Sequence, residues 1–342
     1  MRSSWLTVVP IALFCGCAGT PPGNPAALPA QSNASVGSDH LGVTPLNAPA
    51  SVFPGIVSTE PTGIRAKLIA AVITLRDGKT VGGLYDRATQ TWRHVGYPSA
   101  ASTAAYGPES IPGGYRVAGS FTYPRQKNAI GFVYDSVTKR YVTLEVPSPL
   151  VCAPVACTTY TIAHSVYGGR GHFRVVGDYA YAIESPPSQW RPFLYDSVTK
   201  TLATIDIPKS VSTTAHGLWV DGNVVTVAGG YTDSSGVHGY VRDLGSGKLL
   251  TYDYPGATTT RFEGITGSDG RGNYALAGDY TLPHDAAVYG FYVQIFNWKA
   301  WPPIVIGRLS ANSIDGHDVV GVYHPGGKVS GFITTIPIQD PP

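Results

Sequence analysis

Two short sequence patterns alternate along this chain, and this internal repetition constrains the fold more than any other feature. The first pattern is a Gly or Pro followed by aromatic and apolar residues, and three of its copies end in Tyr-Asp. Its six copies begin at Gly83, Gly131, Pro192, Gly239, Gly290 and Gly331. The second pattern is an apolar pair, a Gly and an aromatic residue two positions later, with copies beginning at Val117, Val175, Val227, Leu276 and Val319. Repetition at intervals of 41 to 61 residues indicates an architecture built from similar units of a few strands each.

Each repeat has room for about four short strands separated by turn residues, which is the size of a propeller blade. Charged residues make up only 13% of the chain, whereas it contains 41 Gly and 21 Tyr. This composition favours strands and tight turns over helices. We therefore predict an all-β fold with a single β-propeller. A seven-bladed propeller with one degenerate copy and a pair of β-sandwiches are the alternatives.

The two ends of the repeat region predict how such a ring closes. The residues after Gly331 suffice for only one or two strands. Residues 67–73 align with the second pattern, but no complete unit precedes them. The two partial units sum to one. We predict six four-stranded blades in which the N- and C-terminal strands pair, because this pairing removes exposed sheet edges.

The N-terminus is typical of a bacterial lipoprotein signal peptide. Arg2 precedes a short apolar stretch, and residues 13–17, Leu-Phe-Cys-Gly-Cys, are similar to a lipobox in which Cys17 is acylated. Ordinary cleavage after Ala18 is the alternative. We expect a signal peptide over residues 1–17 and a lipoprotein of the outer membrane or cell surface. Without the lipid, the protein would be periplasmic or secreted.

The rest of the chain divides into a tether and a domain. Residues 18–50 are rich in Pro, Ala, Ser, Gly and Asn, which predicts a disordered tether, and residues 51–342 form the propeller domain. No apolar run of 18 or more residues follows the signal, so the lipid anchor is the only predicted membrane contact. The net charge of +2 is too small to argue for nucleic acid as a partner. We expect a monomer.

Four cysteines are present, and two of them remain for the folded domain. Cys15 would leave with the signal peptide and Cys17 would carry lipid. Cys152 and Cys157 lie close together in the sequence, and in an exported protein this spacing favours a disulfide that closes a loop. A zinc site at these cysteines is not expected, since the nearest histidine, His164, stands alone. We expect no cofactor.

The repeats resemble the HAF type of probable extracellular repeats in exported bacterial proteins. The matching elements are Gly-Phe-Val-Tyr-Asp at 131–135, Tyr-Pro-Gly-Ala at 254–257, Gly-Ile-Thr at 264–266, and the longer stretch 227–240. The resemblance extends over residues 53–342 and is strongest between 192 and 290. It implies a propeller-like, exported repeat protein. It implies no activity, because the family is defined by its architecture and carries no assigned catalytic motif.

Polar residues recur beside the glycines of the second pattern. We expect the strand that carries these glycines to lie nearest the propeller axis, because only small residues leave room for crowded backbones there. The residue after each Gly, and one polar position on the preceding strand, would then face the channel. We expect five candidates to gather at one mouth of the axis: His164, His216, Glu263, Asp178 and Asp279.

These five residues have two interpretations. Histidines with carboxylates suit a sugar site, a cation site or acid–base chemistry. Alternatively, they bond backbone groups between blades or line a watery channel, which repetition favours because repeats place like residues at like positions. Our leading hypothesis is a tethered binding module for a protein or a carbohydrate. A carbohydrate hydrolase or lyase and a structural envelope component are the alternatives.

Overall fold

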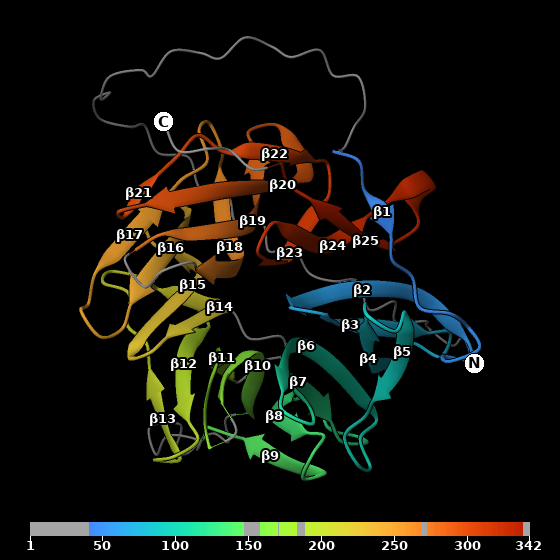
Figure 1. Cartoon of the computed structure of the whole chain (residues 1–342). Helices are drawn as coiled ribbons and strands as arrows, with labels where there is room; N and C mark the ends of the chain where they lie inside the picture. Colours follow the sequence, from blue (N-terminus) through green and yellow to red (C-terminus); the bar gives the residue numbers. More distant parts are fainter. Residues whose placement is uncertain (1–40, 147–157, 170, 183–188, 268–271, 338–342) are drawn as a thin grey trace, which may run out of the picture. The chain divides into compact units, whose positions relative to one another are not determined.

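The structure is a computed structural model that describes residues 41–146, 158–169, 171–182, 189–267 and 272–337. These residues form a β-propeller, in which short antiparallel sheets surround a common centre (Figure 1). Within the described ranges, the one helical element is a single 3-10 turn, η2 (Pro325–Gly327). No helix in them is long and apolar enough to cross a membrane. The predicted all-β propeller is confirmed.

Four sheets have four strands each. In three of them every strand pairs with the next one along the chain. The first holds β2 (Ile56–Arg65), β3 (Leu68–Leu75), β4 (Thr80–Asp86) and β5 (Thr91–Val95). The second holds β6 (Ser102–Ile111), β7 (Gly114–Thr122), β8 (Ile130–Asp135) and β9 (Arg140–Leu144). The third holds β10 (Thr158–Gly169), β11 (His172–Ala182), β12 (Arg191–Asp196) and β13 (Thr201–Thr204). The fourth holds β23 (Ser310–Asp315), β24 (Asp318–Tyr323), β25 (Ser330–Thr335) and β1 (Thr44–Pro45).

The remaining strands form one nine-stranded sheet. It holds β14 (Ser212–Asp221), β15 (Val224–Thr232), β16 (Val237–Asp243), β17 (Leu249–Tyr252), β18 (Thr259–Gly267), β19 (Tyr274–Leu282), β20 (Asp285–Phe296), β21 (Lys299–Ala300) and β22 (Ile304–Gly307). The described residues therefore form four separate four-stranded sheets and this larger one, and not the six separate four-stranded blades that were expected. A parallel bridge from Val237 to Thr259 joins β16 to β18. Pro302 and Pro303 stand between β21 and β22, where they have no N–H to donate to a ladder.

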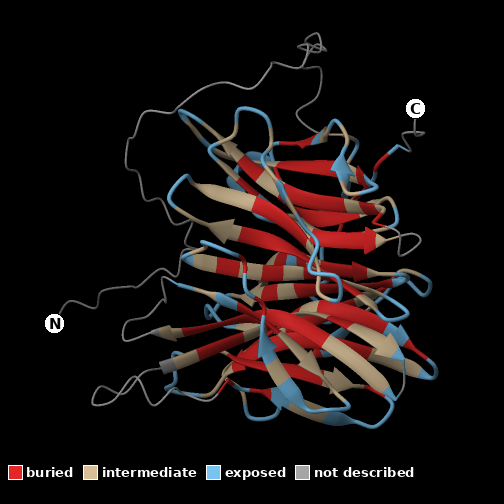
Figure 2. Ribbon diagram, turned by 90° about the vertical axis from the view of Figure 1, so that its left-hand side faces the viewer, coloured by how far each residue is buried: buried red, intermediate tan, exposed pale blue. Residues whose placement is uncertain are grey.

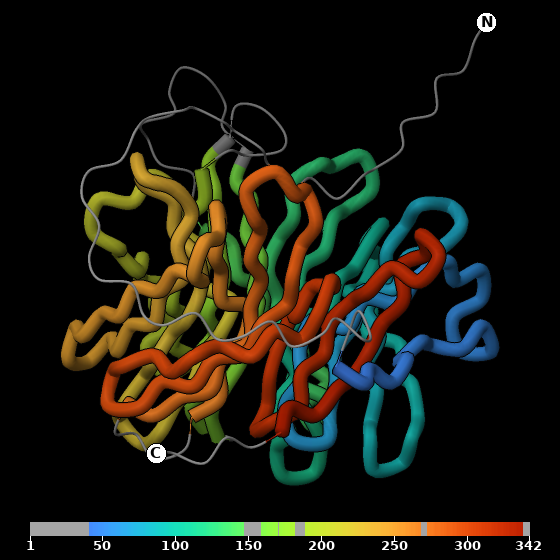
Figure 3. Tube along the Cα trace, turned by 90° about the horizontal axis from the view of Figure 1, so that it is seen from above, coloured from blue at the N-terminus to red at the C-terminus, as the bar shows by residue number. Residues whose placement is uncertain are grey.

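The predicted pairing of the two chain ends is confirmed, but a different segment makes it. Thr44 and Pro45 of β1 pair with β25, which brings the two ends of the described chain side by side (Figure 3). Leu46 and Ala48, which follow β1, are buried. The folded unit thus begins before Ser51, inside the segment predicted as a tether. Residues 67–73 belong to the complete first sheet, not to a shared one.

The two sequence patterns are cross-strand neighbours in the sheets. Gly119 pairs with Phe132, and Gly177 pairs with Phe193. A Cβ on Gly177 would lie 2.8 Å from the Phe193 ring, so the glycine admits the ring of the next strand. The pairing recurs at Gly229–Tyr240, Gly278–Phe291 and Gly321–Phe332. These aromatic rings are fully buried between sheets, and the turns at the strand ends are exposed (Figure 2).

The strand nearest the axis is not the one that was expected. The glycine strands β7, β11, β15, β19 and β24 each pair with an innermost strand and lie one strand farther from the axis. A Cβ on any of their five glycines would lie 1.9–2.2 Å from a carbonyl oxygen of that innermost strand. The innermost strands are the preceding ones, β2, β6, β10, β14, β18 and β23 (Figure 1). Each of these contacts the next, and β23 contacts β2, so they form a closed ring.

Candidate functional site

Each innermost strand has an irregularity at the same place, and the residue at that place lines a central cavity. The antiparallel register shifts by one residue in every case, as a β-bulge does. A bulge re-aims one side chain and is common beside functional sites. The residues at the bulges are Thr62, Tyr106, His164, His216, Glu263 and Asn312. The ring of strands therefore presents six side chains, one from each strand, to one cavity.

Small residues follow the bulges and bring the inner strands close together. Gly63, Gly107, Gly217 and Gly264 each stand directly after a bulge residue. A Cβ on Gly63 would lie 1.8 Å from the carbonyl oxygen of Tyr106 on the next strand. No side chain fits in that space, so close backbone approach requires glycine at this position.

The cavity has a volume of about 170 Å³, and Arg65 extends across part of it. Arg65 lies on β2, and its Nη2 donates to the carbonyl oxygen of Leu218 on β14 at 3.0 Å. In the ring of inner strands, β14 stands opposite β2. The guanidinium also lies over the rings of Tyr167, at 4.5 Å, and Trp219, at 5.2 Å. These contacts hold a buried positive charge at the cavity wall.

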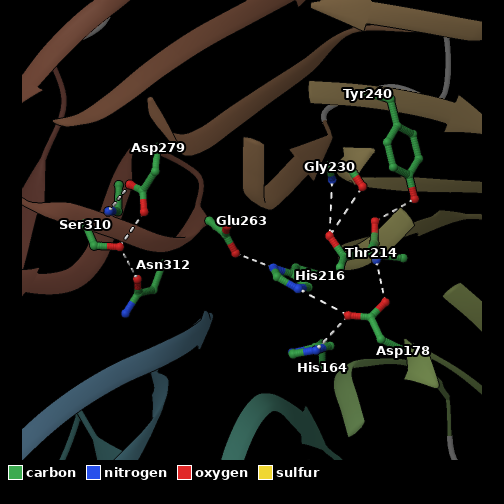
Figure 4. A network of polar contacts seen from close by, with 12 residues as sticks. His164, Asp178, Thr214, His216, Gly230, Tyr240, Glu263, Asp279, Ser310 and Asn312 are labelled. Carbon is green, nitrogen blue, oxygen red and sulfur yellow. Dashed lines mark hydrogen bonds and ion pairs between the residues drawn. The ribbon is translucent and has the colours of Figure 1, made fainter. Parts of the chain in front are cut away.

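Four of the five predicted residues come together in what we call the His–carboxylate cluster: His164, Asp178, His216 and Glu263 (Figure 4). Oδ2 of Asp178 lies 3.1 Å from Nε2 of His164 and 3.3 Å from Nε2 of His216. Nδ1 of His216 contacts Oε2 of Glu263, and the two imidazole rings have their centroids 4.2 Å apart. The structure thus brings four of the five candidate residues into contact.

The charges in the cluster are set by burial and by these contacts. Burial alone would lower the pKa of His216, but the charge of Glu263 and the bond to Asp178 outweigh it and raise that pKa to about 10. Burial and the neighbouring His216 lower the pKa of His164. Burial opposes ionisation of Asp178, yet its bonds to the two histidines lower its pKa. At neutral pH, His216 is a cation between two carboxylates, and His164 is neutral.

Asp279, the fifth candidate, has a different position and role. Its Oδ1 accepts from the backbone N–H of Ala311 at 2.8 Å, and its Oδ2 accepts from the Ser310 hydroxyl. It does not line the cavity. Burial, followed by the charge of Glu263, raises its pKa to about 7. Asp279 thus bonds backbone between neighbouring repeats, as the structural interpretation predicts.

Asp178 shares this structural role, but it also has the two histidines. Its Oδ1 accepts from the backbone N–H of Ala215 at 2.8 Å, as Asp279 does from Ala311. Its Oδ2 remains for His164 and His216. Three donor atoms, one from each of these residues, lie within 4.8 Å of one another. Asp178 therefore belongs both to the scaffold and to the His–carboxylate cluster.

Several expectations fall elsewhere. Cys17, Cys152 and Cys157 lie outside the described residues, and with them the predicted lipidation and disulfide. Sequence reasoning missed the cavity residues Thr62, Tyr106, Asn312, Glu60 and Arg65. One pattern could have identified three of them, because every bulge residue on an inner strand is followed directly by Gly or Ser. That pattern includes Thr62, Tyr106 and Asn312 together with His164, His216 and Glu263.

Comparisons with known proteins bear on the fold. No protein-family model matches the sequence, and no curated protein matches it. The match to the solved structure of YjhT covers 84% of this chain and 96% of the YjhT chain, at 11% sequence identity and a TM-score of 0.52. The match to the β-propeller domain of the Trilobed protease from Pyrococcus furiosus covers 82% of this chain and 95% of that domain's chain, at 15% sequence identity and a TM-score of 0.43. The match to the PL25 polysaccharide lyase, an ulvan lyase, covers 82% of this chain and 95% of the lyase chain, at 7% sequence identity and a TM-score of 0.46. The likeness is one of fold.

Proposed function

We propose that this chain is a propeller-type binding module that takes one monosaccharide unit, free or at the end of a glycan, in its central cavity. The observation that carries the proposal is the ring of six bulge residues. Each inner strand turns one side chain toward the same space, and the six side chains are of five residue types. A scaffold role alone would be served by six similar residues, as it is by the buried Gly–aromatic pairs.

The size of the cavity limits the ligand. A cavity of about 150 Å³ admits benzene, and this one has about 170 Å³. It therefore has room for about one six-membered ring. A polysaccharide chain does not fit inside, so the proposal is for a single sugar unit.

The chemistry of the wall matches a polyhydroxylated ligand. Hydroxyl groups of a sugar both donate and accept hydrogen bonds. The cavity offers carboxylate acceptors on Glu60 and Glu263, donors on Arg65, and hydroxyl or amide groups on other bulge residues. Such a mixture of few, convergent polar groups is typical of small-molecule sites.

The test is titration of the purified full chain in detergent with glucose, N-acetylglucosamine, rhamnose and glucuronate, followed by calorimetry. Glu263→Gln removes one charged acceptor and should weaken binding by about 10- to 100-fold, the value of a charge-assisted hydrogen bond. Glu145→Gln, at an exposed glutamate outside the cavity, is the matched control and should bind like the unsubstituted chain. If none of the four sugars binds at 10 mM, the proposal is overturned.

A carbohydrate hydrolase or lyase is the second candidate, and one contact favours it. The carboxylate of Asp178 lies beside His164, and a histidine oriented by a carboxylate is a common general base. The same preparation, incubated with oligosaccharides and analysed for new reducing ends or unsaturated products, separates turnover from binding. Products that form with the unsubstituted chain and are lost in His164→Gln would replace the binding module by an enzyme.

For the location of the protein, we propose export and attachment through lipid on Cys17. The sequence of the first 17 residues supports this proposal. Cys17→Ser should move the protein from the membrane fraction to the soluble fraction of cells that express it. Equal membrane association of the variant and the unsubstituted chain would contradict the anchor.

We also propose that the nine-stranded sheet represents two blades, which makes six around the axis. The ring of six inner strands in mutual contact supports this count. So does the link between β16 and β18, which is a single residue pair. An experimental structure in which β18 is separate from β16 would agree with it, and an experimental structure with a continuous ladder between the two strands would contradict it.

A further inference from the structure

His164, Asp178 and His216 present three metal-ligating atoms to one point. Oδ2 of the aspartate lies 3.1 Å from Nε2 of His164 and 3.3 Å from Nε2 of His216, and one ligand atom from each of the three residues lies within 4.8 Å of the other two. Asp178 is 2% exposed, and its other oxygen is engaged by the N–H of Ala215. The oxygen nearest the histidines is therefore fixed in place and oriented toward them (Figure 4).

The spacing of these atoms agrees with a tetrahedral metal ion. Zinc holds nitrogen and oxygen ligands at about 2.0–2.1 Å, so neighbouring ligand atoms in a tetrahedral site lie about 3.3 Å apart. The aspartate oxygen lies 3.1 Å from His164 Nε2 and 3.3 Å from His216 Nε2. Each histidine nitrogen therefore lies about as far from the aspartate oxygen as two ligands of one tetrahedral ion lie from each other.

Glu263 supplies what a metal-binding histidine ordinarily has behind it. Its carboxylate contacts Nδ1 of His216, the nitrogen that faces away from Asp178. A carboxylate on the far nitrogen fixes the ring and its tautomer, and it makes the near nitrogen a better ligand. His216 is thus held between an orienting carboxylate and the point where the three ligating atoms meet.

We propose that His164, Asp178 and His216 bind one divalent transition-metal ion, with Glu263 as the residue that positions His216. Two imidazoles and one carboxylate suit zinc and its neighbours in the first transition series, and not calcium or magnesium, which prefer oxygen ligands. Three protein ligands leave the fourth position of a tetrahedral metal ion open. In catalytic zinc sites, water or a substrate occupies that position. His164 and His216 line the cavity, so that position faces the proposed sugar site. In this respect the inference rests on the proposed function, although metal binding itself does not need the sugar.

A proton on His216 is the competing explanation for the closeness of these groups. A protonated imidazole between two carboxylates would satisfy the same contacts without any metal. The two explanations differ in what happens when a metal ion is offered. A site built for a metal exchanges the proton for the ion, whereas a purely structural ion pair does not.

The experiment uses the full chain in detergent, freed of metal with EDTA and then dialysed. Zinc is titrated by calorimetry, and cobalt(II) is added separately, because tetrahedral cobalt with nitrogen and oxygen ligands has visible absorption bands that report its geometry. We expect one equivalent of zinc to bind at this site, and we expect the absorption bands of tetrahedral cobalt(II). Asp178→Asn keeps the acceptor for Ala215 and should weaken zinc binding by more than 100-fold, and Glu263→Gln should weaken it by about 10- to 100-fold, as loss of an orienting partner does.

The matched control is Asp279→Asn, which alters the equivalent backbone-bonding carboxylate without touching a histidine. It should bind zinc like the unsubstituted chain. Both variants have the same cysteines, so binding to thiols cannot produce the difference between Asp178→Asn and Asp279→Asn. If Asp178→Asn does not fold, as judged by circular dichroism, His164→Gln takes its place with the same expectation.

Equal zinc affinity in the unsubstituted chain and the ligand variants overturns the proposal, and so does the absence of cobalt bands. Sugar titration with and without zinc separates this inference from the proposed function. Zinc binding with no sugar binding leaves the metal site standing and removes the sugar proposal. Sugar binding with no zinc binding leaves the sugar proposal standing and removes the metal site.

Discussion

The carboxyl of Asp279 makes the pH dependence of folding a direct test of the electrostatics at the propeller centre. Its pKa lies at about 7 in the folded protein, against an ordinary value of 3.8, because burial and the charge of Glu263 disfavour ionisation. Between about pH 4 and pH 7 the folded state keeps a proton that the unfolded state has released. The free energy of unfolding therefore falls as the pH rises through this range.

The size of the effect follows from that difference. At about 1.4 kcal/mol per pH unit, the shift from 3.8 to about 7 amounts to about 4 kcal/mol. This is a maximum, because Asp279 is partly exposed to solvent. Asp279→Asn removes the titration and keeps an oxygen acceptor for the N–H of Ala311. The variant should match the unsubstituted chain near pH 4 and exceed it in stability at pH 8.

The assay is denaturant unfolding followed by tryptophan fluorescence at pH values from 4 to 8, with EDTA present. Asp178→Asn is the control of opposite sign, because the pKa of Asp178 is lowered by its histidine partners. That variant should be less stable than the unsubstituted chain at pH 7, and the difference should shrink as the pH falls below about 4. If the stability of Asp279→Asn runs parallel to that of the unsubstituted chain from pH 4 to pH 8, Asp279 is ionised throughout and the reasoning is refuted.

Three further predictions concern the scaffold. Phe193→Ala removes a fully buried ring that packs against Gly177, and it should lower the free energy of unfolding by about 3–5 kcal/mol in denaturant titration. Gly278→Ala would place a Cβ 2.0 Å from the carbonyl oxygen of Arg261, so its melting temperature should fall, whereas Gly171→Ala, in open space, should melt like the unsubstituted chain. Deletion of residues 1–48 removes β1 and exposes the edge of β25, so it should lower the melting temperature and cause association in size-exclusion chromatography, and deletion of residues 1–40 should do neither.

The fold was predictable from the sequence because its two patterns contact each other. Gly119 and Phe132 belong to different patterns, yet they are partners across two neighbouring strands, and four other repeats have the same pair. A pattern that reflects a packing contact repeats wherever the contact repeats. The division into blades was less predictable. The bridge from Val237 to Thr259 is one residue pair, and nothing in the repeat marks it.

The order of strands around the axis was predicted wrongly for a physical reason. Small residues were taken as the sign of the strand nearest the axis, but the glycines of the second pattern lie one strand farther out. There they face a backbone carbonyl of the inner strand and, at Gly119, Gly177 and Gly321, also an aromatic ring. The glycines that do permit crowding at the centre are Gly63, Gly107, Gly217 and Gly264, each of which follows a bulge. The Gly or Ser after each bulge residue can be read in the sequence, but the bulge itself is a property of the register between two strands.

The bulge separates the chemistry of this protein from its scaffold. Asp178 and Asp279 bond the backbone of the next repeat in the same way, through the N–H of Ala215 and of Ala311. What differs is the residue that follows in the chain, His216 at one place and Asn312 at the other. Beside His216 the carboxylate takes part in the proposed metal site, and beside Asn312 it bonds the N–H of Ala311 and the Ser310 hydroxyl. A change at one bulge leaves the Gly–aromatic core untouched, so six positions can vary in chemistry while the repeat stays the same. This is why the repetition that reveals the fold carries so little information about the ligand.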